Sequence, residues 1–238
     1  MTIIEVRGLR KTYGSTVAVD GIDLDVGEGE VFGVLGPNGA GKTTTIECIA
    51  GLRKPDSGTI RVDGLDPARD RAAITRQVGV QLQEAGLQAK LTVREAIALF
   101  TGFYDDPVDG YELAERLHLQ SKLDTRYRDL SGGQKQRLAI CLALIGRPRI
   151  MLLDEPTTGL DPRNRREVWT VVEELRERGA TVLLVTHYME EAEYLCDRLA
   201  LIDRGRISAL DTTSGIIGRT DSPTVMSFSP SRRFDAHA

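Results

Sequence analysis

The fold of this chain is decided by residues 31–47, which read VFGVLGPNGAGKTTTIE. The stretch opens with an apolar run that has the length of one buried strand. Next comes the pattern GxxxxGKT, from Gly36 to Thr43, which is the spacing of a phosphate-binding loop. The residues that follow predict a helix that ends at Gly51. This order of strand, glycine loop and helix predicts an α/β domain that binds a nucleoside triphosphate.

The residue types in this loop suit a triphosphate. Backbone N–H groups can surround its oxygens only where no Cβ is in the way, and the helix start adds the positive end of its dipole. Lys42 is expected to bring a charge to the β- and γ-phosphates and to assist catalysis, and Thr43 a hydroxyl to a magnesium ion. The alternative is a chance glycine-rich turn before a helix. The candidate nucleotide-binding residues here are Gly36, Pro37, Asn38, Gly39, Ala40, Gly41, Lys42, Thr43 and Thr44.

Composition limits the class of protein. The 238 residues suit one large domain, or one domain with an inserted lobe, and 41% hydrophobic residues allow a sizeable core. A net charge of −4 gives no support to nucleic-acid binding, and none is expected. No apolar run approaches the roughly 18 residues that span a bilayer, and no signal peptide is expected. The separated cysteines Cys48, Cys141 and Cys196 are expected to be buried free thiols in a reducing cytoplasm.

The pattern along the chain predicts a sheet-based domain with an insertion. Residues 1–84 and 147–215 contain the strand-like runs, with antiparallel strands near the N-terminus. Residues 85–146 are predicted to form an inserted helical lobe, because capped helical stretches replace the strand pattern there. Residues 216–238 are expected to be a polar tail, or the start of a truncated accessory region.

Local signals predict some element limits that bear on the fold. Residues 3–9 predict a first strand that ends at Gly8. Residues 17–26 alternate in the manner of antiparallel strands, with a break at Gly21. Beyond Asp211 the chain is expected to be irregular, because its residues are polar and show no periodicity.

Two carboxylates follow another apolar run. Residues 150–156 read IMLLDEP, which places Asp154 and Glu155 at the C-terminal end of a predicted buried strand. Parallel sheets bind ligands at that edge. Asp154 is therefore a candidate for holding Mg²⁺ through its water shell, and Glu155 is a candidate general base for an attacking water. Taken alone, two acids after a strand are equally consistent with an ordinary turn.

Two further stretches are ambiguous in isolation. Residues 130–134 read LSGGQ and begin a helix at Ser131. This helix start is either another anion site or simply a well-capped helix. His187 follows the apolar strand predicted at residues 181–186, where a core histidine is the plainer interpretation.

Taken together, these motifs resemble the nucleotide-binding domain of ATP-binding cassette (ABC) transporters, across residues 1 to about 215. The stretch LSGGQ matches the family signature without departure. The resemblance implies that Asp154 and Glu155 are the Walker B magnesium aspartate and catalytic glutamate. It implies that His187 is the switch histidine, which contacts the nucleotide and assists catalysis.

Three more residues receive roles only through this resemblance. The ring of Tyr13 would stack on adenine. Gln83 looks like the glutamine of the Q-loop, which would contact the nucleotide and the magnesium ion and assist catalysis. Asp161 belongs to a stretch similar to the D-loop and would lie beside the nucleotide.

The resemblance also implies a fold and partners. The fold would be an α/β P-loop NTPase (RecA-like) core with a mainly parallel sheet, an N-terminal antiparallel β-subdomain and an inserted α-helical subdomain. ATP and Mg²⁺ would be the cofactors. ATP on one protomer would contact the signature of the other, giving an ATP-dependent, head-to-tail homodimer. A transmembrane permease on a separate chain would hold the protein at the cytoplasmic face of the cell membrane. The signature residues concerned are Ser131, Gly132, Gly133 and Gln134.

Within the family, the motifs look most like the drug-resistance, ABC-2 type exporter ATPases of bacteria. The predicted function is therefore ATP hydrolysis that powers export of a drug, lipid or other small molecule. An ABC importer ATPase would look nearly the same. A non-transport ABC protein in DNA repair or translation would need a long coiled coil or a second such domain. A P-loop kinase is a further alternative, but it would not explain the LSGGQ stretch or His187.

Overall fold

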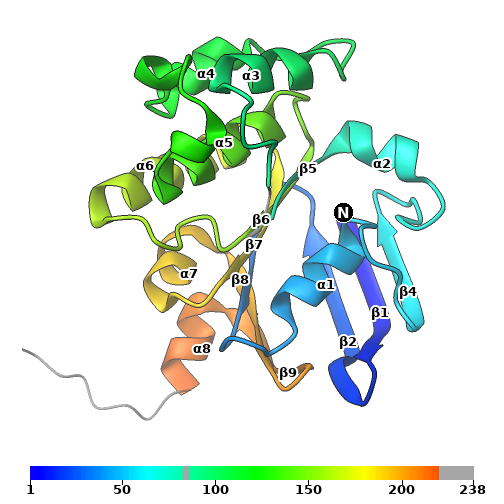
Figure 1. The fold of residues 1–238 in the computed structure, drawn as a ribbon. Coiled ribbons are helices and arrows are strands. Elements are labelled where there is room, and N and C mark those ends of the chain that lie inside the picture. The colour runs from blue at the N-terminus through cyan, green and yellow to red at the C-terminus, as the bar shows by residue number, and fades with distance from the viewer. Residues whose placement is uncertain (83–85, 220–238) are drawn as a thin grey trace, which may run out of the picture.

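The computed structural model describes residues 1–82 and 86–219, and two sheets organise them (Figure 1). The larger sheet has the order β5-β6-β7-β3-β8-β9, and the smaller one has the order β2-β1-β4. The strands are β1 (Thr2–Tyr13), β2 (Thr16–Gly27), β3 (Val31–Leu35), β4 (Ser57–Val62), β5 (Val78–Gln81), β6 (Ile150–Asp154), β7 (Thr181–Thr186), β8 (Arg198–Asp203) and β9 (Arg206–Thr212).

Helices cover both faces of the larger sheet. One of them, α1, packs between the two sheets, because it contacts β1, β2 and β4 on one side and β6 and β7 on the other. The helices are α1 (Lys42–Ile49), α2 (Arg71–Gln77), α3 (Val93–Thr101), α4 (Gly110–Arg116), α5 (Gly132–Leu144), α6 (Pro162–Glu177), α7 (Met189–Leu195) and α8 (Thr213–Arg219), with 3-10 turns η1 (Gln120–Lys122) and η2 (Tyr127–Asp129).

The larger sheet is parallel except at one edge. β5, β6, β7, β3 and β8 run in the same direction, and β9 alone pairs antiparallel, with β8. Strands β3, β6 and β7 are buried along their whole length. Parallel strands covered on both faces read as continuous apolar runs, and this is the pattern that residues 31–35 and 150–153 show in the sequence.

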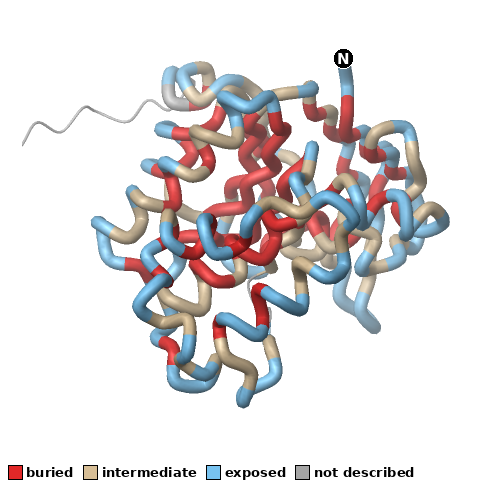
Figure 2. Tube along the Cα trace, turned by 90° about the horizontal axis from the view of Figure 1, so that it is seen from above, coloured by how far each residue is buried: buried red, intermediate tan, exposed pale blue. Residues whose placement is uncertain are grey.

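Two apolar cores lie on the two faces of this sheet. One is built with α1 and the smaller antiparallel sheet, and includes Phe32 and Ile46. The other joins the sheet to α3, α4, α5, α6 and α7, and includes Leu153 and Trp169. Figure 2 shows buried residues concentrated along the central strands and exposed residues around the periphery. The predicted α/β class, with a mainly parallel sheet and an antiparallel sheet formed near the N-terminus, is confirmed.

Glycines bend the first two strands without ending them. Gly8 and Gly21 have φ angles of 57° and 79°, and the β1–β2 register shifts beside them. A bulge places one residue in the left-handed region and increases the local twist, while pairing continues on both sides. The prediction that the first strand ends at Gly8 was therefore wrong, and residues 17–26 belong to one long strand.

The prediction of an irregular chain beyond Asp211 was also wrong. Strand β9 continues to Thr212, and α8 follows from Thr213 to Arg219. The sequence TSGIIGR has poor helix propensity, but its Ile216 is 5% exposed and belongs to the apolar core. Tertiary packing, rather than local preference, stabilises this helix. Across residues 1–82 and 86–219, every helix is too short or too polar to cross a bilayer.

Candidate functional site

The predicted motifs meet because their strands are neighbours in the larger sheet. The central order β6-β7-β3 brings together strands that are far apart in the sequence. Leu35 pairs with Thr186, and Asp154 pairs with Val185, so the three strands end at the same edge. The residues that directly follow each strand, Gly36, Glu155 and His187, therefore lie around one site. This is the carboxyl edge, where parallel sheets bind ligands.

The glycines of residues 36–41 let the loop pack closely. A Cβ on Gly36 would lie 2.2 Å from the carbonyl oxygen of Ile202, and one on Gly41 would lie 2.2 Å from that of Ala18. Gly41 also has a φ angle of 103°, a conformation that residues with a Cβ rarely adopt. Pro37, Asn38 and Gly39 are exposed, so the outer part of the loop is open to a ligand.

Lys42 lies under this loop as the first residue of α1. Its side chain is 5% exposed, and Nζ donates hydrogen bonds to the carbonyl oxygens of Gly36 (2.8 Å) and Pro37 (3.1 Å). The ammonium therefore sits at the centre of the loop that was predicted to bind phosphates. Thr43 and Thr44 follow in the first turn of α1, and Ala40 is the buried residue of the loop.

Glu155 contacts residues from two of the other predicted motifs. Its Oε1 lies 3.6 Å from Nζ of Lys42 and 3.3 Å from Nδ1 of His187. Its Oε2 accepts a hydrogen bond of 3.1 Å from the Thr158 hydroxyl. Glu155 is 6% exposed and has a φ angle of 50°, in the left-handed region. The structure thus brings together three residues that were predicted from separate motifs to act in catalysis.

Asp154 is buried beside Glu155, with the Thr43 hydroxyl near its carboxylate but not in standard hydrogen-bond geometry. Its side chain is fully buried, and neither carboxylate oxygen has a hydrogen-bond partner among the described residues. Burial raises the pKa of the Asp154 carboxyl to about 6, an effect that the Thr43 hydroxyl and the Lys42 charge oppose and the Glu155 carboxylate increases. Buried carboxylate oxygens with no partner, beside a threonine hydroxyl, fit a hard divalent cation such as Mg²⁺.

Three contributors to this site were not predicted. Gln81 is fully buried, and its Nε2 donates to the carbonyl oxygens of Leu82 (2.9 Å) and Asp154 (3.3 Å). Thr158 binds the Glu155 carboxylate, and Gln136 of α5 donates to the Glu155 carbonyl oxygen (3.2 Å). A glutamine in an otherwise apolar strand was the one signal in the sequence that pointed to Gln81.

The LSGGQ stretch forms a capped helix start. The Ser131 hydroxyl accepts from the backbone N–H of Gln134 (3.2 Å), and the Gln134 side chain accepts from the backbone N–H of Ser131 (2.9 Å). These reciprocal bonds are a capping box at the first turn of α5. Ser131 and Gly132 are exposed, whereas Gly133 and Gln134 are partly buried. Within one chain, the signature residues therefore cap a helix, which is one of the two interpretations that the sequence left open.

The remaining predicted residues lie around this centre or outside the described chain. Asp161 caps α6, because its carboxylate accepts from the backbone N–H groups of Arg163 and Asn164. Tyr13 is 42% exposed, and its ring centroid lies 5.2 Å from the Arg53 guanidinium. Gln83 falls outside the described residues, so its predicted role rests on the sequence alone.

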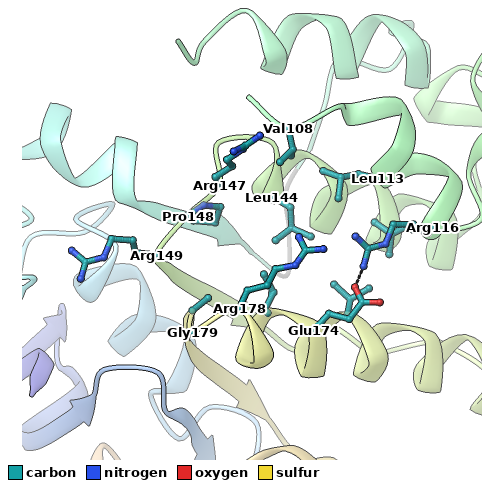
Figure 3. Close-up of a pocket in the computed structure, with 14 residues that line it drawn as sticks. Val108, Leu113, Arg116, Leu144, Arg147, Pro148, Arg149, Glu174, Arg178 and Gly179 are labelled. Atoms are coloured by element: carbon teal, nitrogen blue, oxygen red, sulfur yellow. Dashed lines mark ion pairs between the residues drawn. The ribbon is translucent and has the colours of Figure 1, made fainter. Parts of the chain in front are cut away.

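A cavity of about 610 Å³ lies at the opposite edge of the sheet. Its lining includes Pro148, which precedes β6, and Ala180, which precedes β7. Apolar side chains from α4, α5 and α6 line it, together with arginines, and two of the lining residues, Arg116 and Glu174, form an ion pair (Figure 3). None of the predicted site residues within residues 1–82 and 86–219 lines this cavity.

Known proteins resemble this chain in sequence and in fold. The family described as "ABC transporter" matches residues 19–158, which is more than half of the chain. Nod factor export ATP-binding protein I of Cupriavidus metallidurans is 44% identical over 212 residues, which cover 86% of this chain and 69% of that protein. Daunorubicin resistance ATP-binding protein DrrA3 of Streptomyces coeruleorubidus is 43% identical over 224 residues, which cover 92% of this chain and 71% of that protein.

Solved structures agree with this placement. An ATP-binding subunit of an ABC transporter superposes with a TM-score of 0.83 at 30% identity, covering 91% of this chain and 92% of that one. A dimeric ATP-binding cassette in a post-hydrolysis state, bound to ADP and Pi, superposes with a TM-score of 0.81 at 28% identity, covering 88% of this chain and 98% of that one. The export names of the sequence relatives favour export over import. The chain belongs to the ABC transporter family, as an ATP-hydrolysing subunit similar to those of exporters.

Proposed function

We propose that the carboxyl edge of the larger sheet binds and hydrolyses ATP in a head-to-tail dimer of this chain. Hydrolysis then powers export through a permease on a separate chain, with this subunit held at the cytoplasmic face of the membrane. One observation carries the site assignment. Glu155 lies within 3.6 Å of both Lys42 and His187, beside the partnerless carboxylate of Asp154.

Binding begins at the loop of residues 36–41. The exposed outer loop and the N-terminus of α1 offer backbone N–H groups to the phosphates, and Lys42 supplies a cation beneath them. Tyr13, exposed at the end of β1, supplies a ring face for adenine.

The magnesium site consists of oxygen donors from three elements. Thr43 offers a hydroxyl, Asp154 offers a buried carboxylate, and Gln83 is proposed as the third contact on the strength of the sequence. The ion, when bound with ATP, neutralises charge on the phosphate oxygens. Without a cation, Asp154 remains a buried carboxylate with no hydrogen-bond partner among the described residues, which is a costly arrangement for a protein to keep unless it has a ligand.

Glu155 is proposed to take the proton from the attacking water. It is nearly buried, and Thr158 holds one carboxylate oxygen while the other faces Lys42 and His187. A carboxylate fixed in this way can accept a proton without first reorganising. His187 is proposed to orient this carboxylate and to contact the γ-phosphate, which the 3.3 Å separation of Nδ1 and Oε1 supports. Its side chain is 29% exposed, so a ligand can reach it.

The second half of each site comes from the other protomer. Ser131 and Gly132 are exposed at the N-terminus of α5, where free backbone N–H groups suit a γ-phosphate. Gly133, Gln134 and Asp161 would lie at the same interface. The similarity to a dimeric cassette bound to ADP and Pi supports this arrangement.

The transported molecule is proposed to be a drug, a lipid or another small molecule. Support comes from the relatives named for Nod factor export and daunorubicin resistance. The direct test is purification of this chain with the membrane protein encoded beside its gene. ATP hydrolysis by the reconstituted pair should rise with the exported compound. A gene for an extracytoplasmic binding protein in the same cluster would instead indicate import.

The catalytic assignment is tested by Glu155→Gln. The variant should bind ATP yet lose hydrolysis by roughly 10²-fold or more, which is the usual scale for a missing general base. It should also accumulate as an ATP-bound dimer in size-exclusion chromatography. The matched control is Glu193→Gln, because Glu193 is an exposed glutamate of α7. Normal turnover in Glu155→Gln would remove this residue from the mechanism.

A further inference from the structure

The signature helix is attached to the backbone of Glu155 in the same chain. Nε2 of Gln136, on the second turn of α5, donates a hydrogen bond of 3.2 Å to the Glu155 carbonyl oxygen. Gln136 is partly buried, and it lies on the same helix that Ser131 caps. No motif in the sequence assigned a role to Gln136.

Two other contacts join the start of α5 to the segment that follows β6. A Cβ on Gly133 would lie 2.9 Å from Cδ2 of Leu160, so the start of α5 packs closely on the loop before α6. Nη1 of Arg137 lies 3.4 Å from Oε2 of Glu167, which links α5 to α6 itself. The first turns of α5 and residues 155–167 therefore form one connected unit.

The backbone that Gln136 holds is unusual. Glu155 has a φ angle of 50°, in the left-handed region that residues other than glycine adopt uncommonly, and unlike Arg204, which has a similar φ at an exposed turn, Glu155 is buried. Its N–H donates to the Val185 carbonyl oxygen (2.8 Å), and its carbonyl oxygen also accepts from the Thr158 N–H (3.2 Å). Because φ sets the direction of the Cα–Cβ bond, these bonds decide where the carboxylate points.

We propose that Gln136 is a positioning residue for hydrolysis, which fixes the Glu155 backbone from the signature helix. This inference rests on the proposed roles of Glu155 and Ser131. In a head-to-tail dimer, Ser131 meets the nucleotide of the partner, whereas Glu155 serves the nucleotide bound to its own chain. Gln136 therefore links occupancy of one composite site to the geometry of the base at the other.

The first test is Gln136→Leu, which removes the donor but keeps the size and helix propensity of the side chain. The turnover number should fall about tenfold, while the dissociation constant for ATP stays within about twofold, because the lost contact acts on the base and not on the bound substrate. Gln136→Glu keeps the shape but replaces the donor with an acceptor, and should lose as much. Gln120→Leu is the control, since Gln120 is an exposed glutamine in η1, away from Glu155. Equal losses in turnover and in ATP affinity would overturn the proposal.

The second test asks whether Gln136 acts through Glu155. In single-turnover measurements, adding Gln136→Leu to Glu155→Gln should cause no further loss, because the base is already absent. Loss by the same factor in both backgrounds would assign Gln136 a general structural role and overturn the proposal. If Glu155→Gln itself hydrolyses ATP normally, the catalytic assignment fails first, which is a distinguishable result.

The third test concerns the link between the two sites. The Hill coefficient of hydrolysis against ATP concentration should exceed 1 in the native dimer, because occupancy of one site orders the base of the other. It should move toward 1 in Gln136→Leu and stay at the native value in Gln120→Leu. An unchanged coefficient in Gln136→Leu would remove the link between the sites.

Discussion

The ammonium of Lys42 lies 3.6 Å from Oε1 of Glu155, so the cation of the phosphate loop is paired with the proposed catalytic base. Both side chains are nearly buried, at 5% and 6% exposed. Water screens the attraction between two buried charges less than it screens the attraction between surface charges. At this distance, the Glu155 carboxylate therefore attracts the Lys42 ammonium appreciably. When a nucleotide binds, its phosphates and the Glu155 carboxylate therefore compete for the Lys42 ammonium.

This pair predicts that Glu155→Gln binds ATP more tightly than the native chain. Removing the carboxylate frees the Lys42 ammonium for the phosphates and removes a negative charge from beside them. A gain of about 1 kcal/mol, or roughly fivefold in the dissociation constant, is expected for a pair of this kind. Isothermal titration with ATP and EDTA, which prevents turnover, measures it. Glu193→Gln should bind as the native chain does, and weaker binding by Glu155→Gln would contradict the prediction.

Asp154 predicts a pH dependence of stability in the metal-free chain. Burial raises the pKa of its carboxyl from 3.8 to about 6. Between about pH 4 and 6 the folded chain keeps a proton that the unfolded chain has released, so the free energy of unfolding falls as the pH rises. For a shift of about two pKa units, the loss above pH 6 is about 3 kcal/mol.

Asp154→Asn should remove this loss. In EDTA, urea unfolding should show the variant gaining stability over the native chain as the pH rises from about 4 to 6, with the full difference present above pH 6. Mg²⁺ with a non-hydrolysable ATP analogue should shrink the difference, because the native carboxylate then binds the ion. Asp105→Asn, at an exposed position, is the control. A difference that does not change with pH would show that Asp154 does not titrate in this range.

Tyr13→Ala should weaken ATP binding by about 1–3 kcal/mol, the usual contribution of a stacked base. Tyr13→Phe and Tyr13→Trp keep a ring face and should bind normally. Tyr111→Ala is a matched control, because Tyr111 is also 42% exposed and also has an arginine over its ring. Fluorescence titration with a labelled nucleotide gives the affinities. If Tyr13→Ala binds ATP with unchanged affinity, Tyr13 does not stack on adenine and is simply a surface tyrosine.

The composite site predicts that two inactive variants restore each other in part. Lys42→Ala loses the phosphate cation on its own face, and Ser131→Arg places a bulky cation where the nucleotide of the partner must dock. Each homodimer then has two defective sites. In a mixed dimer both changes fall on one site, because in the proposed head-to-tail dimer Lys42 of one chain would face Ser131 of the other. The second site keeps native residues on both sides.

Mixing the two variants should therefore raise hydrolysis above that of either alone, up to half the native sites in each mixed dimer. The assay needs the isolated protein and also the protein with its permease, because isolated domains often dimerise weakly. Doubling the concentration of either variant alone is the control for simple mass action. The composite site is contradicted if a structure of an ATP-bound dimer shows Ser131 beyond hydrogen-bond distance of any nucleotide. The signature would then act only as a helix cap.

The sequence by itself determined the motifs and most of the secondary structure. The glycine spacing of residues 36–41, the apolar run before Asp154 and the capping box at Ser131 are local patterns, and local patterns survive in the folded chain. They were sufficient to predict the α/β class and the family, but not α2 or α8. The bulges at Gly8 and Gly21 were misread as strand ends, because a glycine marks both features in the same way.

Only the tertiary structure decided which residues meet. Lys42, Glu155 and His187 follow three strands that are remote in the chain, and they converge because the sheet orders those strands β6-β7-β3. The left-handed backbone of Glu155 and its bond to Gln136 depend on how α5 packs against the end of β6, which no local pattern specifies. Helix α8 exists for the same reason, since Ile216 gains its stability from a core formed by distant residues.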